Sequence, residues 1–245
     1  MSGHNKWSTI KRKKEKVDAA RGRIFTRLIK EITIAARMGG GDTDSNARLR
    51  TAVFSAKSQN MPQDNITRAI KKGTGELPGI SYEEVTYEGY GPGGCAILIE
   101  AVTDNKNRTT PEIRHIFTKY NGNLGNANSV SWMFSKKGSI QIPRESATED
   151  QLLELLLDAG VEDISMDEEF FSVTTPPQSF ESAKAILEEN KIPIASSELT
   201  MIAQNTKKLE GKEAESTLKL MDAMEDQEDV QNVFSNFDID DDMME

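Results

Sequence analysis

The residues of this chain that are best suited to bind a ligand are cations that recur along one side of a predicted helix. At about 100° of rotation per residue, five of them fall within an arc of roughly 80°. They are Lys16, Arg23, Arg27, Lys30 and Arg37. Lysine and arginine neutralise phosphates and release the counterions that surround them. A row of this kind is therefore typical of a surface that follows a nucleic-acid backbone.

The helix that positions this row is predicted over residues 17–38, and three consecutive glycines at 39–41 end it. Its apolar residues recur on the other side, roughly 160° from the centre of the cationic arc. We therefore expect the apolar side to face a core and the cations to stay exposed. Three interpretations of the row remain open: contact with nucleic acid, contact with an acidic protein surface or the chain's own acidic domains, and a plain solvated face. The near absence of acidic residues in the row favours the first.

Further basic residues surround the row on both sides. Before it lies a basic segment around Trp7, which we expect to act as a flexible arm that orders on binding. Trp7 either stacks on a base or pins the arm to the helical domain. After the row, two more predicted helices extend the basic character, and Arg50, Lys57, Lys71 and Lys72 belong to this wider wall. The candidate nucleic-acid-binding residues are Lys6, Trp7, Lys11, Arg12, Lys13, Lys14, Lys16, Arg23, Arg27, Lys30, Arg37, Arg48 and Arg68.

Charge is divided sharply along the chain. Residues 1–75 hold 17 Lys and Arg against 6 Asp and Glu, a net charge of +11, whereas residues 76–245 hold 13 against 34, a net charge of −21. Such asymmetry points to nucleic-acid or membrane contact. No apolar run is long enough to span a bilayer, and the N-terminus lacks the apolar stretch of a secretory signal. With one cysteine, Cys95, the composition predicts a cytoplasmic protein without membrane contact.

Hydrophobic periodicity predicts an α+β protein of several domains. Residues 1–76 form a basic helical domain, with a second helix from 44 or 45 to 58 and a third that starts at Pro62 and is closed by Gly73. Residues 77–137 and 204–237 form an α/β domain with strands at 82–90, 95–103, 130–134 and 230–237 and helices at 110–120 and 212–224. Residues 138–203 read β-α-β-β-α-β, the order of a ferredoxin-like unit inserted in the second domain. Residues 238–245 are an acidic tail.

Catalysis finds no support in the sequence. The two histidines, His4 and His115, lie in unrelated contexts, and Cys95 lies in an apolar strand, as expected for a buried small hydrophobe. The glycine-rich segment at residues 91–94 joins two strands and lacks the spacing of a phosphate-binding loop, so it predicts a turn with positive φ. We expect no catalytic residue, no cofactor and no metal.

Five ordered motifs together resemble the YebC/PmpR family of regulatory proteins. They are MSGHNKWSTIKRKK at 1–14, RGRIFTRLIKEI at 21–32, MPQDNITRAIKKG at 61–73, YEGYGPGG at 87–94 and TDNKNRT at 103–109. The resemblance covers essentially the whole chain; its departures, Asn5 and Cys95, change no charge. It implies three domains around a cleft, a helical domain followed by two α/β domains, the third inserted in the second.

The resemblance also implies a non-enzymatic, cytoplasmic, DNA-binding transcriptional regulator. Relatives in mitochondria are translational activators, and bacterial members have been tied to ribosome function, so a factor that binds ribosomal RNA is the alternative. The residues do not choose between DNA and RNA, since no helix-turn-helix, RNP motif or KH loop is present. The acidic α/β domains are expected to repel the same polymer, and a protein partner on them is a further expectation.

Overall fold

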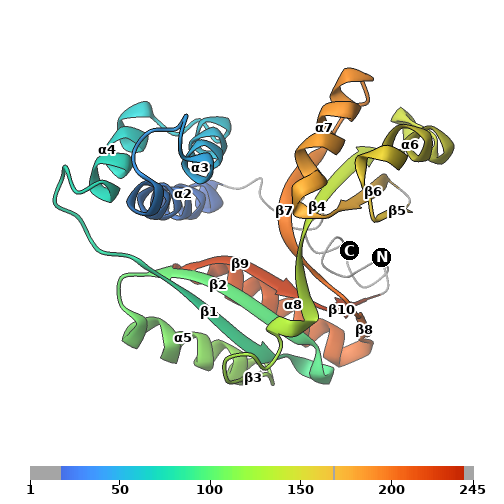
Figure 1. Cartoon of the computed structure of the whole chain (residues 1–245). Helices are drawn as coiled ribbons and strands as arrows, with labels where there is room; N and C mark the ends of the chain where they lie inside the picture. Colours follow the sequence, from blue (N-terminus) through green and yellow to red (C-terminus); the bar gives the residue numbers. More distant parts are fainter. Residues whose placement is uncertain (1–17, 168, 240–245) are drawn as a thin grey trace. The chain divides into compact units, whose positions relative to one another are not determined.

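The computed structural model describes residues 18–167 and 169–239 of the 245-residue chain. It is an α+β protein with a helical N-terminal domain and two α/β domains (Figure 1). The chain divides into two compact units. One contains residues 132–208 and 236–238, and the other contains the described residues before 132 together with 209–235 and 239. The domain boundaries given above remain a prediction.

Three helices form the N-terminal domain: α2 (Asp18–Gly39), α3 (Ala47–Ser58) and α4 (Gln63–Gly73). They enclose one apolar core, which includes Ile32, Leu49 and Ile66, each fully buried. The predicted start of α3 at 44 or 45 is slightly early, because Asn46 is its N-cap: the side-chain oxygen of Asn46 accepts from the Leu49 backbone N–H at 3.0 Å. The amide of Asn46 also donates to the Ala35 carbonyl at 2.8 Å, which ties α3 to α2.

Gly73 is the last residue of α4 and Thr74 follows as the C-cap, so the prediction of Gly73 as the C′ glycine is wrong by two positions, and Gly75, with a φ of 83°, takes that place. The lack of a side chain at Gly73 has a packing reason instead. A Cβ at Gly73 would lie 2.4 Å from the Thr33 carbonyl oxygen and 2.8 Å from the Ala36 side chain. The glycine therefore allows α4 to approach α2 closely.

A four-stranded antiparallel sheet of order β3-β1-β2-β9 follows in the same unit. Its strands are β1 (Glu83–Tyr90), β2 (Ala96–Thr103), β3 (Asn123–Leu124) and β9 (Val230–Ser235). Two helices, α5 (Lys106–Lys119) and α8 (Gly211–Asp226), lie on one face of the sheet (Figure 1). All but one residue of β2 are buried, as its continuous apolar run predicted. The last strand completes this sheet, also as predicted.

Two predicted elements differ from the structure in this region. Helix α5 begins at Lys106 instead of 110, because Asn105 caps it by accepting from the Arg108 N–H at 3.2 Å. The strand predicted at 130–134 is wrong: residues Ser131–Met133 form a short 3-10 helix. Backbone N–H groups of this segment are used by the Glu88 carboxylate, so they are not available to a neighbouring strand.

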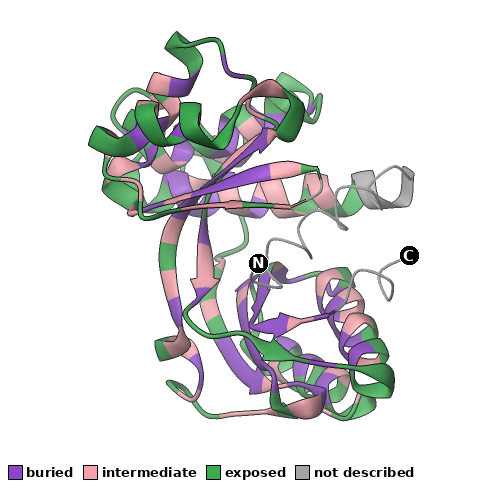
Figure 2. Cartoon of the chain, turned by 90° about the vertical axis from the view of Figure 1, so that its right-hand side faces the viewer, coloured by how far each residue is buried: buried purple, intermediate pink, exposed green. Residues whose placement is uncertain are grey.

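The other unit contains the predicted ferredoxin-like arrangement. Strands β4 (Phe134–Pro143), β5 (Asp163–Met166), β6 (Phe170–Thr175) and β7 (Ser196–Ala203) form an antiparallel sheet of order β5-β6-β4-β7. Helices α6 (Glu149–Leu156) and α7 (Phe180–Glu189) supply the crossovers, which confirms the β-α-β-β-α-β order. Apolar residues of both helices share one core with β4 and β6, as the buried inner surfaces in Figure 2 show.

A short parallel pair, β8 (Lys207–Lys208) with β10 (Phe237–Asp238), belongs to the unit that contains residues 132–208 and 236–238. The strand predicted at 230–237 is therefore split into β9 and β10, which lie in different sheets. Among the described residues, no helix is long and apolar enough to cross a membrane.

Candidate nucleic-acid interface

Two cations of the α2 row, Arg23 and Lys30, form ion pairs with the chain's own acidic residues in this structure. Lys30 lies at the centre of the row, and its Nζ is 2.7 Å from Asp229 Oδ1 and 3.0 Å from the Glu228 carbonyl oxygen. The side chains of Lys30 and Asp229 are 5% and 1% exposed. The expectation that the whole row stays exposed is therefore wrong for Lys30.

Asp229 is the centre of a buried polar cluster. Its second carboxylate oxygen accepts from Arg108 at 2.9 Å, from Thr109 at 2.6 Å and from Thr103 at 3.2 Å. Burial alone would raise the pKa of Asp229, but the hydrogen bonds from Lys30, Thr109 and Arg108 outweigh it and lower the pKa to about 2. Asp229 thus stays ionised and joins α2 to the start of α5.

The other described members of the row also contact the segments at 81–82 or 225–229. Arg23 forms an ion pair with Asp226 at 3.0 Å, and Arg27 donates to the Glu225 carbonyl. Arg37 donates to Ser81 Oγ at 2.6 Å and to the Tyr82 carbonyl at 3.2 Å. The rotation of residues along one helix does not predict these contacts, because the partners of Arg23, Arg27 and Lys30 lie some 200 residues later in the chain and those of Arg37 some 45 residues later. The interpretation that assigned the row to the chain's own acidic domains accounts for these contacts.

Arg48 has a similar structural role. Its guanidinium donates to Glu31 of α2 at 2.7 Å and to Glu84 of β1 at 2.5 Å. It therefore bridges two helices of the N-terminal domain and the first strand of the sheet. As a nucleic-acid contact, Arg48 remains an untested prediction.

Besides Arg23 and Arg37 of α2, the exposed cations among the described residues of the helical domain lie on α3 and α4. Residues 47–73 hold six Lys and Arg and one acidic residue, a net charge of +5. Five of the six are exposed: Arg50, Lys57, Arg68, Lys71 and Lys72. Within the part of the chain that the structure describes, no ion pair is recorded for any of the five, and only Arg50 is held, by the carbonyls of Thr43 and Asp44. We call this set the α3–α4 basic surface.

The basic arm lies outside the described residues. This applies to Lys6, Trp7, Lys11, Arg12, Lys13, Lys14 and Lys16, so their predicted contacts with nucleic acid are untested.

The motif at residues 87–94 has a structural role that the sequence did not reveal. The Glu88 carboxylate accepts three backbone N–H bonds, from Asn128, Val130 and Ser131, each at 2.7 Å. Burial alone would raise the pKa of Glu88, but these three bonds outweigh it and lower the pKa. The Tyr90 hydroxyl adds a bond to the Ser129 carbonyl at 2.9 Å. The motif therefore fixes the loop that leads into β4.

The turn that follows has positive φ at Gly93 (67°) and Gly94 (78°), as predicted for this segment. Cys95 after it is fully buried, and burial raises the pKa of its thiol. The predicted turn and the predicted burial of Cys95 are both confirmed. Each has a structural role.

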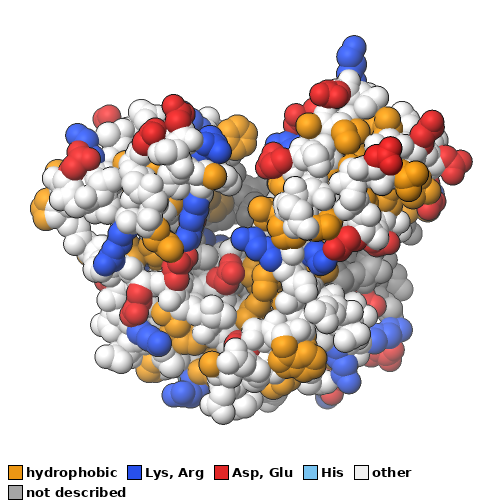
Figure 3. All heavy atoms as spheres, in the orientation of Figure 1, with side chains coloured by type: hydrophobic (Ala, Val, Ile, Leu, Met, Phe, Trp, Pro, Cys, Tyr) orange, Lys and Arg blue, Asp and Glu red, His pale blue; other side chains and the backbone are white. Residues whose placement is uncertain are grey.

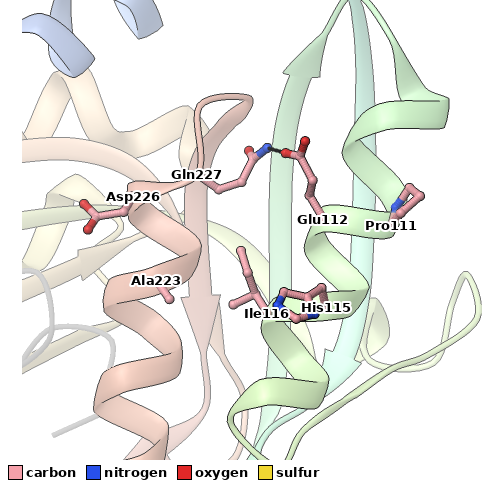
Figure 4. A pocket seen from close by; sticks show the side chains of 7 residues that line it. All are labelled: Pro111, Glu112, His115, Ile116, Ala223, Asp226 and Gln227. Atoms are coloured by element: carbon pink, nitrogen blue, oxygen red, sulfur yellow. Dashed lines mark hydrogen bonds between the residues drawn. The ribbon is translucent and has the colours of Figure 1, made fainter.

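A groove of about 560 Å³ lies between α5 and α8 (Figure 4). Its polar residues are Glu112, His115, Asp226 and Gln227. Figure 4 shows Glu112 bonded to Gln227, at 2.8 Å, and His115 on the next turn of α5. No serine, cysteine or lysine lines the groove, and across residues 18–167 and 169–239 no acidic, histidine or cysteine side chains are grouped as they would be around a metal ion. The groove thus offers no pair of a nucleophile and a base.

Fold and charge together define a class: three-domain α+β proteins in which a basic helical domain precedes two acidic α/β domains. Residues 5–76 match the family model of the TACO1/YebC protein N-terminal domain, and residues 82–237 match that of the TACO1/YebC second and third domain. The chain belongs to the TACO1/YebC family, as its motifs indicated.

Two close relatives carry the name of probable transcriptional regulatory proteins. A "probable transcriptional regulatory protein" of Geotalea uraniireducens is 59% identical over 100% of this chain and 99% of its own length. One from Geobacter sulfurreducens, of the same name, is 58% identical with the same coverage. A crystal structure of a conserved hypothetical protein from Aquifex aeolicus has a TM-score of 0.81 at 46% identity, over 93% of this chain and 94% of that one.

Proposed function

We propose that this protein is a DNA-binding regulator of transcription that contacts phosphates through its helical domain and works in the cytoplasm as a binding protein, without catalysis. The α3–α4 basic surface is the observation on which the proposal rests. Its five exposed cations lie on two helices that share a core. The packing of these helices holds the cations in place, and their side chains remain accessible in the folded protein. The names of the relatives support a role in transcription.

The energetics follow from the charges. Each phosphate neutralised by a lysine or arginine releases counterions, which favours binding at low salt and gives the affinity a steep salt dependence. The remainder of the chain is strongly acidic and repels the same polymer. Attraction and repulsion together orient the helical domain toward the nucleic acid. The sequence before α2 contributes further lysines and arginines to the positive charge of the N-terminal part of the chain.

The structure changes the role that we assign to the α2 row. Lys30 is used inside the protein, where it holds the helical domain against Asp229. Arg23 and Asp226 form an exposed pair, 49% and 62% exposed, which is worth little in water. A phosphate can therefore compete for Arg23, whereas Lys30 acts only by positioning the domain.

The test is a triple charge reversal, Lys57→Glu with Arg68→Glu and Lys71→Glu, whose side chains are exposed and remote from the core. Its matched control, Lys136→Glu with Lys212→Glu and Lys219→Glu, makes the same charge change on exposed residues of the acidic domains. The first variant should lose affinity for duplex DNA, and its salt slope should fall by about 2–3. The control should keep the parent slope. Equal slopes for parent and test variant would refute the proposal.

One observation favours the alternative, a factor that binds single-stranded ribosomal RNA. Phe54 of α3 is 73% exposed, and Arg50 and Lys57 lie on the same side of the helix, within about 60° of rotation. Exposed aromatic rings between cations stack on unpaired bases, for about 1–3 kcal/mol per base. A Phe54→Ala variant tests this alternative: weaker co-sedimentation with ribosomes, with unchanged duplex binding, would favour RNA. Absence of the parent protein from ribosomal fractions would exclude it.

A further inference from the structure

A leucine-rich segment consists of α6 and the 3-10 turn that continues it, η4 (Leu157–Ala159). This segment holds five leucines. Leu152 and Leu156 are fully buried, and Leu155 packs against the same core. Leu153 and Leu157 instead point outward, with 47% and 79% of their surface exposed. The core is thus complete without them, and their exposure needs another reason.

The two exposed leucines are neighbours. In a helix, residues four apart lie in one row along the surface, so Glu149, Leu153 and Leu157 form a ridge. The adjacent ridge is Asp150, Glu154 and Asp158, all exposed. Residues 149–159 contain no lysine or arginine. Figure 3 shows acidic side chains with exposed hydrophobic ones among them on the lobe that holds α6 and α7.

A single exposed leucine needs no explanation, but two on adjacent turns beside three carboxylates form a patch with a definite chemistry. We propose that the ridges of α6 and η4, namely Leu153 and Leu157 beside Asp150, Glu154 and Asp158, bind a basic segment of another protein. The leucines take apolar side chains of the partner, and the carboxylates pair with its lysines and arginines.

Charge argues against a nucleic acid, an anionic membrane and a twofold dimer of this chain as occupants of the patch. A nucleic acid or an anionic membrane would be repelled by the acidic ridge. A second copy docked through the same patch would set like charges against each other, because a twofold interface pairs a surface with itself. A basic protein segment complements both the charge and the apolar row. The proposal is independent of the nucleic-acid contacts proposed for α3 and α4.

Its first test uses the full chain and a defined probe, a fluorescein-labelled helical peptide of lysine and alanine with two leucines one turn apart. The parent protein should bind it, and both Leu153→Ser/Leu157→Ser and Glu154→Lys/Asp158→Lys should weaken binding by at least about 10-fold. The control, Glu181→Lys/Glu189→Lys on α7, has the same charge change at exposed positions and should stay within about twofold of the parent. Thermal unfolding of each variant verifies that it is folded.

Three outcomes overturn the proposal: no binding to the parent, full binding to the leucine variant, or an equal loss in the α7 control. A second test replaces Leu157 by an apolar photoreactive side chain in cells. Cross-links should map to lysine- and arginine-rich protein segments and should disappear with Glu154→Lys/Asp158→Lys. Cross-links to nucleic acid, to a second copy of this chain, or to nothing would overturn it.

Discussion

Lys30 of α2 and Asp229, which directly precedes β9, form a buried ion pair with 2.7 Å between Nζ and Oδ1. Removing Lys30 takes the cation from Asp229 Oδ1. Arg108 and Thr109 still bond to the other carboxylate oxygen. Lys30→Met should therefore destabilise the protein by about 3 kcal/mol, the low end for a broken buried pair, measured by denaturant unfolding. The exposed pair offers a matched control, since Arg23→Met should cost at most about 1 kcal/mol. Equal costs for the two variants would show that Lys30 contributes no more than a surface cation.

The same cluster predicts an acid-labile contribution to stability. The pKa of Asp229 is lowered from 3.8 to about 2, so its ionised form is favoured by folding. The resulting stabilisation, about 2 kcal/mol, is present above pH 4 and is lost as the pH falls toward 2. Asp229→Asn should flatten this part of the curve of unfolding free energy against pH. An unchanged acid limb in the variant would contradict the assignment.

The Glu88 carboxylate should stabilise the loop that contains Asn128, Val130 and Ser131. Glu88→Gln removes the charge that accepts three backbone N–H bonds, and we expect a loss of about 1.5–3 kcal/mol. Hydrogen exchange should speed up at Asn128, Val130 and Ser131 while α3 and α4 stay protected. Uniformly faster exchange would instead indicate global unfolding.

The glycine-rich turn provides a pair of matched substitutions. A Cβ at Gly93 would lie 2.5 Å from Leu209 and 2.7 Å from Glu213, whereas one at Gly94 would meet nothing within 4 Å. Both have positive φ, so each alanine costs about 1–2 kcal/mol of backbone strain. Gly93→Ala should therefore lower the melting temperature clearly more than Gly94→Ala. If the two variants melt together, the contacts with Leu209 and Glu213 are easily relieved.

The elements that were predictable are those whose pattern is local. The split β-α-β-β-α-β order and the apolar run of β2 are both set by near neighbours in sequence, and both are confirmed. The strand at 130–134 failed because its N–H groups bind a carboxylate some 40 residues earlier. The burial of Lys30 could not be predicted for the same reason, because nothing near it in the sequence indicates an ion pair with Asp229.

The positive charge of the proposed interface could be predicted from the sequence, but which of its cations stay exposed could not. This charge was evident from the first 75 residues. The location of the interface depended on which cations the folded chain neutralises, and that requires the tertiary contacts of Arg37, Arg48 and Asp229. Apart from Arg23 and Arg37, the exposed cations on described residues of the helical domain are those of the α3–α4 basic surface.

Lysine footprinting tests this central claim most directly. Acetylation of the free protein and of its DNA complex is compared residue by residue by mass spectrometry. Bound nucleic acid should protect Lys57, Lys71 and Lys72 and leave Lys212 and Lys219 on α8 as reactive as before, because phosphates cover only the first set. Unchanged reactivity at Lys57 and Lys71, or protection of Lys212 and Lys219 instead, would contradict the account.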